Sequence, residues 1–62
     1  MRNDRADIVA AEVEAKQVER QRLREVRAPD RLLERNRLDV VRLQQELTQA
    51  LIERYAAKAR AA

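Results

Sequence analysis

The sequence has no cysteine, no histidine, no glycine and no serine, and it has only one proline and one aromatic residue, Tyr55. Without cysteine there can be no disulfide framework, and without cysteine and histidine the usual zinc sites cannot form. Without glycine there is no loop of the kind that cradles phosphate groups. A nucleophilic triad cannot be built either, because Thr48 is the only aliphatic hydroxyl.

One carboxylate pair has a spacing that metal binding or acid–base chemistry could use. Asp30 and Glu34 lie four residues apart, on one face of a helix. Arg31, Arg35 and Arg37 surround them, which favours ion pairing along a solvent-exposed helix. We therefore expect a protein that is not an enzyme and has no cofactor.

The chain is also short of large apolar side chains. A chain of 62 residues buries only about 60% of the surface that its unfolded form exposes, so such a domain is marginally stable by itself. The apolar fraction of 45% includes 11 alanines, and only 15 residues are valine, isoleucine or leucine. A monomer would have a thin core, and we expect partner chains to supply much of the stability.

The sequence offers no signal for a membrane. No apolar segment approaches the roughly 20 residues that a membrane span requires. The acidic residues Asp4 and Asp7 and the short apolar segment 8–11 do not fit a signal peptide. We expect a soluble intracellular protein with no membrane partner, in the cytoplasm or within a virion or another large complex.

Composition and spacing predict an all-α protein. Alanine, leucine, arginine, glutamate and glutamine dominate, and these are strong helix formers. Asn3 or Asp4 can cap a first helix over about 4–27. Pro29 interrupts that helix and suits the first position of a second helix, over about 29–60. The single unit 1–62 is then a hairpin bent sharply at Pro29 or one long kinked helix, and we favour the hairpin.

The second helix carries apolar residues on two faces. The first has the three-and-four spacing of a coiled-coil seam and comprises Leu33, Asn36, Val40, Leu43, Leu47 and Ala50, widened by Leu32 and Leu51. The other comprises Leu38, Val41, Ile52 and Tyr55. A helix with two apolar faces usually has two neighbours, so both faces are predicted to be partner interfaces. Alternatively, Leu38 and Ile52 are scattered apolar residues of the kind found on most surfaces.

Asn36 is the polar member of the seam. It can set the register or the oligomeric state of the helices through a paired hydrogen bond. It can also simply lie where the seam frays beside the bend. Both interpretations fit the sequence.

The first helix has a weaker apolar face. Its members are Ile8, Ala11, Ala15, Val18 and Val26, with Val9 and Leu23 at its edge. Arg22 interrupts this face. Such a helix cannot easily cover both apolar faces of the second helix, which again favours further partners.

The cations are concentrated around Pro29. Residues 20–42 contain eight arginines and four acids, a net charge of +4, whereas the whole chain carries +3. Arginine pairs bidentately with phosphate, so this cluster can contact a nucleic-acid backbone. The candidate contacts are Arg20, Arg24, Arg27, Arg31 and Arg35.

The same arginines can instead pair with neighbouring acids. Three pairs have helical spacing for this, namely Glu34–Arg37, Arg35–Asp39 and Arg42–Glu46. No aromatic residue lies between 20 and 42, which argues against binding of single strands by base stacking. Protein contacts are therefore the favoured role for the cluster, with nucleic acid as the second interpretation.

These observations favour a small non-enzymatic structural or adaptor protein. Helix–helix contacts, through self-association or with other proteins, would hold it in an oligomer or a large assembly. A minor virion or phage component is one example. The alternative is a dimeric helical regulator that binds nucleic acid through the arginines around Pro29.

Overall fold

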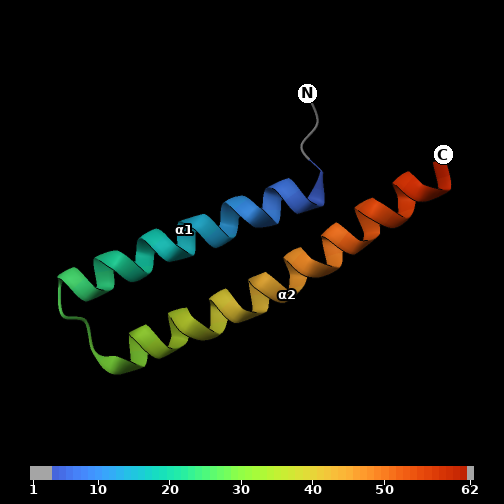
Figure 1. Ribbon diagram of the computed structural model, residues 1–62. Helices are drawn as coiled ribbons and strands as arrows, with labels where there is room; N and C mark the ends of the chain where they lie inside the picture. Colours follow the sequence, from blue (N-terminus) through green and yellow to red (C-terminus); the bar gives the residue numbers. More distant parts are fainter. Residues whose placement is uncertain (1–3, 62) are drawn as a thin grey trace.

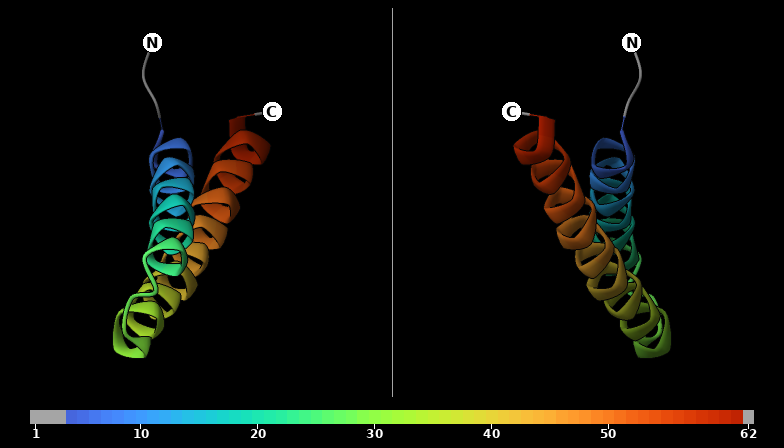
Figure 2. Two further views of the ribbon diagram at one scale, coloured as in Figure 1. Left: turned by 90° about the vertical axis from the view of Figure 1, so that its left-hand side faces the viewer. Right: turned by 90° about the vertical axis from the view of Figure 1, so that its right-hand side faces the viewer.

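The computed structural model describes residues 4–61, which form two α-helices packed against each other as an antiparallel hairpin (Figure 1). α1 spans Arg5–Glu25 and α2 spans Asp30–Ala61. The predicted all-α fold with a sharp bend is confirmed, in its hairpin form. The molecule measures 50 × 22 × 10 Å, and its two helices cross at a shallow angle (Figure 2). Over residues 4–61, neither helix carries an apolar stretch long enough to cross a lipid bilayer.

α1 begins at a capping aspartate. Asp4 has extended backbone angles, and its Oδ1 accepts a hydrogen bond from the backbone N–H of Asp7 at 3.1 Å. This bond satisfies one of the four N–H groups that the first turn of a helix leaves without a partner. Asp4 is one of the two predicted caps, and the other, Asn3, lies outside the described residues.

α1 ends in a Schellman motif made without glycine. The N–H of Ala28 donates to the carbonyl of Leu23 at 2.9 Å, and the N–H of Arg27 donates to that of Arg24 at 3.1 Å. Arg27 lies between these bonds with φ 52°, in the left-handed region that glycine usually occupies. The left-handed residue ends the helix at Glu25, two residues before the predicted boundary.

Pro29 leads directly into α2. Its carbonyl accepts hydrogen bonds from the N–H groups of Leu32 at 2.9 Å and Leu33 at 3.4 Å. Asp30, placed in the first turn, suits the positive end of the helix dipole. Pro29 therefore lies one position before the first residue of α2, whereas the sequence predicts it at the first helical position.

The core between the helices is thin. Its buried residues are Ala6, Val9 and Val13 on α1 and Asn36, Leu43 and Ala50 on α2. Val9, Val13 and Leu43 form one apolar cluster, against which the partly buried Leu47 packs. With two alanines and one asparagine among six buried residues, the interface removes little apolar surface from water.

α1 packs through a different face from the one predicted. Ile8 and Val18, on the predicted face, are at least half exposed, as is Val26. The inner face of α1, which contacts α2, comprises the buried residues and also Lys16, Arg20 and Leu23, which are half-buried. The apolar pattern alone pointed to the wrong side of α1, because two positions of the true inner face are charged.

Candidate functional site

The coiled-coil seam of α2 is occupied by α1. Among its predicted interface residues, Asn36 and Leu43 are buried, and Leu33, Val40, Leu47 and Leu51 are half-buried. The helix–helix packing expected with partner chains is therefore made within the hairpin at these positions. A partner of the folded hairpin has to use other surfaces.

Asn36 is the polar centre of this seam, with only 2% of its surface exposed. Its Nδ2 donates to the backbone carbonyl of Lys16 and to Oε2 of Glu19, both at 2.9 Å. Nη1 of Arg20 lies 3.5 Å from its Oδ1 and 3.4 Å from the carbonyl of Leu33, so these two contacts are long. Among the described residues, no buried side-chain polar atom lacks a hydrogen-bond partner. Asn36 thus joins α2 to α1 of its own chain.

Charged residues extend this polar region along one side of the hairpin. Nζ of Lys16 lies 3.3 Å from Oε2 of Glu19 and 3.4 Å from Oδ2 of Asp39. The hydrogen bond from Asn36, followed by that from Lys16, lowers the pKa of Glu19 below its ordinary value. Glu19, followed by Asp39, raises the pKa of Lys16. Lys16 and Glu19 on α1 thus bind Asp39 and Asn36, respectively, on α2.

The open end of the hairpin is held by a second set of ion pairs. Nε and Nη2 of Arg54 donate to the two carboxylate oxygens of Asp4 at 2.7 and 2.6 Å, and Nη2 also reaches Oδ1 of Asp7 at 3.1 Å. Arg5 pairs with Glu53 at 3.4 Å. The Arg54 guanidinium is the main cause that lowers the pKa of Asp4. The cap of α1 is thereby joined to α2, a contact that no feature of the sequence pattern predicts.

The second apolar face of α2 has no partner within the hairpin. Leu38, Val41, Ile52 and Tyr55 are 54%, 40%, 55% and 66% exposed. We call these four residues the outer stripe. At 3.6 residues per turn, the outer stripe lies roughly 140° around α2 from the seam that faces α1. The largest apolar side chains of α2 outside the seam therefore gather on one exposed line.

The predicted apolar face of α1 is also left open. Ile8, Ala11, Ala15 and Val18 are all exposed. This face is the weaker of the two, because two of its five predicted members are alanines. It offers a comparison surface for experiments on the outer stripe.

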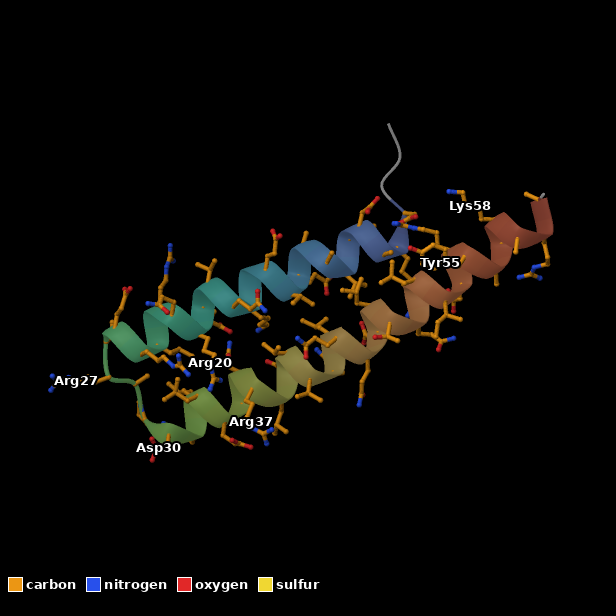
Figure 3. The ribbon with its side chains drawn as sticks, viewed as in Figure 1. Arg20, Arg27, Asp30, Arg37, Tyr55 and Lys58 are labelled. Atoms are coloured by element: carbon orange, nitrogen blue, oxygen red, sulfur yellow. The ribbon has the colours of Figure 1, made fainter. Side chains whose placement is uncertain are left out.

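The arginines at the bend are mostly unpaired. Arg20 is half-buried between the helices, whereas Arg27 extends away from the bend into solvent (Figure 3). Arg24, Arg31 and Arg35 are exposed as well. None of these five arginines lies within ion-pairing distance of an acid in the part of the chain that the structure describes.

Of the three ion pairs expected around the cluster, one forms. Nη2 of Arg37 lies 2.6 Å from Oε1 of Glu34, and this contact lowers the pKa of Glu34. Asp39 instead pairs with Lys16 on α1. The Glu34 carboxylate is thus held by an arginine, and residues 4–61 contain no group of three or more side chains arranged to hold a metal ion.

Comparisons with known protein families, with curated proteins and with solved structures found no match to this chain. The function is therefore inferred from the outer stripe and the arginines at the bend.

Proposed function

We propose that this chain is a small non-enzymatic structural or adaptor protein, held by helix–helix contacts in an oligomer or a large macromolecular assembly. A minor component of a virion or phage particle is one concrete form. Its place would be intracellular, in the cytoplasm or within such a particle. The observation that carries the proposal is the exposed outer stripe of α2.

The outer stripe has the spacing of a helix-packing surface. Leu38 and Val41 are three residues apart, as are Ile52 and Tyr55, so each pair covers adjacent turns of one face. Apolar side chains that lie next to each other, as within each pair, mark an interaction site more often than scattered single residues do, and the polar residues Gln45 and Thr48 lie between the two pairs. Tyr55, the only aromatic residue, is also the most exposed member. Tyrosine is enriched in protein interfaces because it combines a large apolar ring with a polar hydroxyl.

The test introduces a charge into the stripe without touching the hairpin core. Ile52→Asp should release the tagged protein from its native assembly, because burying an unpaired carboxylate is costly. Gel filtration of native extracts would then show the tagged chain moving to a small size. Val18→Asp on α1 is a matched control, since Val18 and Ile52 are both 55% exposed. An assembly that tolerates Ile52→Asp as well as it tolerates Val18→Asp would contradict the proposal.

A dimeric nucleic-acid-binding regulator is the second candidate, and the unpaired arginines at the bend favour it. Backbone binding through several arginines would weaken steeply with salt, with a slope that follows the number of phosphates neutralised. Under the leading proposal we expect only weak binding to duplex DNA or RNA at physiological salt.

Replacing Arg24, Arg27, Arg31 and Arg35 with glutamine separates the two candidates. Fluorescence anisotropy with labelled duplexes measures the affinity at several salt concentrations. Submicromolar binding at physiological salt that the four replacements abolish would favour the regulator. Weak binding that they leave unchanged would favour the structural role.

A further inference from the structure

We propose that the partner of the outer stripe is the outer stripe of a second copy of this chain, with the two α2 helices antiparallel about a two-fold axis. This inference rests on the assembly role proposed above and specifies the partner. The two-fold axis would lie beside α2, at the level of the point between residues 46 and 47. Three features of α2 support this arrangement: the symmetry of the stripe, its polar centre and the distribution of charge.

The outer stripe is symmetric about its own midpoint. Val41 and Ile52 lie at equal distances from the point between residues 46 and 47, and so do Leu38 and Tyr55. An antiparallel pair centred there places Val41 of one chain opposite Ile52 of the other, and Leu38 opposite Tyr55. The same patch then serves both copies, as a two-fold interface requires.

The middle of the stripe is polar and has matching symmetry. Gln45 and Thr48 continue the three-and-four spacing between the two apolar pairs, and they too are equidistant from the midpoint. The hydroxyl of Thr48 donates to the carbonyl of Gln44 at 3.0 Å, so its oxygen remains able to accept a hydrogen bond. In the symmetric arrangement the amide of Gln45 from the second copy lies opposite that oxygen and can donate to it.

The polar centre selects one register. A shift of seven residues would place Ile52 opposite Thr48 and Tyr55 opposite Gln45. The contact between Gln45 and Thr48 would then be lost, and the amide of Gln45 would be buried without this acceptor, which disfavours the shifted register. A polar position within an apolar helix seam is a known determinant of register.

The charge distribution favours the antiparallel orientation. The bend region, residues 20–42, carries a net charge of +4, whereas residues 4–19 and 43–61, which form the rest of the hairpin, contain seven acids and five cations, a net charge of −2. A parallel pair would bring two positive bends together. The antiparallel pair places each positive bend beside the open end of the other copy, which carries the net negative charge.

The proposed axis also allows the helices to overlap along nearly their whole length. α2 spans residues 30–61, so its geometric centre lies within about one residue of the midpoint of the stripe. A 32-residue helix is about 48 Å long, and the symmetric pair would cover almost all of it. A dimer centred elsewhere on α2 would leave one end of each helix uncovered.

The experiment combines sedimentation with one distance measurement. The chain contains no cysteine, so Arg35→Cys gives a unique site for a spin label on an exposed part of α2 away from the stripe. In the antiparallel pair the two labelled positions are separated by about 35 Å along the helix axis, whereas in a parallel pair they lie at the same level, within about 20 Å. Sedimentation at tens of micromolar should show a dimer, and pulsed electron spin resonance should show the longer distance.

Charge variants identify the surface that forms the dimer. Ile52→Asp should raise the dissociation constant of the dimer at least about a hundredfold, and Val18→Asp should leave it unchanged. Circular dichroism reports whether each variant keeps its helices. If Ile52→Asp unfolds the chain, the label distance in the otherwise unaltered protein decides.

Three results would overturn the inference: a monomer at these concentrations, a dimer with the shorter distance, or a dimer that Ile52→Asp does not weaken. The proposed function is tested separately. If the purified chain is monomeric but its native assembly still depends on Ile52, only the second copy is wrong as the partner. If neither depends on Ile52, the structural role through the outer stripe is wrong too.

Discussion

Asn36→Ala is expected to destabilise the hairpin by roughly 1.5 kcal/mol at fixed protein concentration. The variant removes the bond from Nδ2 to the carbonyl of Lys16 and the bond to the carboxylate of Glu19. A net hydrogen bond contributes about 1 kcal/mol, and the bond to Glu19 adds no more than that because 48% of the Glu19 side chain is exposed and water can replace the amide. The higher helix propensity of alanine offsets about 0.5 kcal/mol of the stability lost with these bonds.

This loss is large for so small a protein. At roughly 0.05–0.15 kcal/mol per residue, the whole chain has an unfolding free energy of about 3–9 kcal/mol. A decrease of about 1.5 kcal/mol should lower the melting temperature by roughly 6–12 °C, which thermal melts followed by circular dichroism would resolve. Gln49→Ala, at an exposed position of α2, is the control for the change in helix propensity.

A double-mutant cycle with Glu19→Ala separates the two bonds of Asn36. The coupling between positions 19 and 36 reports their direct interaction, and the remaining loss reports the bond to the Lys16 carbonyl. If the unfolding free energy of Asn36→Ala lies within about 0.5 kcal/mol of that of the unaltered chain, the polar centre does not stabilise this hairpin.

Leu43→Asp and Leu47→Asp should each abolish the hairpin and its assembly, because an unpaired charge in the seam costs several kcal/mol. Gel filtration measures the assembly, and assembly retained in both variants would show that α2 packs through another face. Arg27→Gly should raise the unfolding free energy by up to about 1 kcal/mol, since glycine adopts φ 52° without strain. A melting temperature equal to or below that of the unaltered chain would contradict this prediction. The folded-state pKa values of Asp4 and Glu19 are lowered from 3.8 and 4.5, so their contribution to stability is present above those values and is lost as the pH falls below them. The melting temperature should therefore be constant from neutral pH down to about 5 and decrease below about 4.5, and a melting temperature that rises on acidification would refute the role of these contacts.

The elements of this fold follow from simple features of the sequence. Pro29 separates two helix-forming segments, and the three-and-four spacing of Val40, Leu43 and Leu47 marks the side of α2 that packs. Asp4 carries the cap that its residue type and position predict. These features are local, so they can be recognised without knowing how the helices are arranged.

The bend and the inner face of α1 were harder to predict. A left-handed residue at a helix end is usually glycine, and Arg27 takes that conformation because the bond from Ala28 to Leu23 closes the motif around it. Lys16 and Arg20 interrupt the apolar spacing of the inner face, and each has a polar partner on the other helix. A pattern based on apolar residues alone cannot include such positions.

The candidate surfaces were predicted in part. The sequence separated the two apolar faces of α2, but only the packing of α1 shows which of them remains open. The contact of Arg54 with Asp4 joins residues 50 positions apart, and it depends on the length and register of both helices. Neighbouring acids suggested that the arginines at the bend were paired, whereas Asp39 binds Lys16 across the hairpin instead.

The positions of the two polar contacts along the hairpin imply an order of folding. Asn36 and Lys16 are 20 residues apart in the chain, whereas Arg54 and Asp4 are 50 apart. Closing the longer loop first costs about 0.8 kcal/mol more in chain entropy, since this cost grows with the logarithm of loop length. The helices should therefore come into contact first at the bend and then progressively towards the open end. In this order, Asn36 aligns the helices before the apolar cluster around Leu43 forms. Amide hydrogens near residues 5 and 54 should consequently exchange with solvent faster than those beside Asn36, because the last contacts to form are also the first to open.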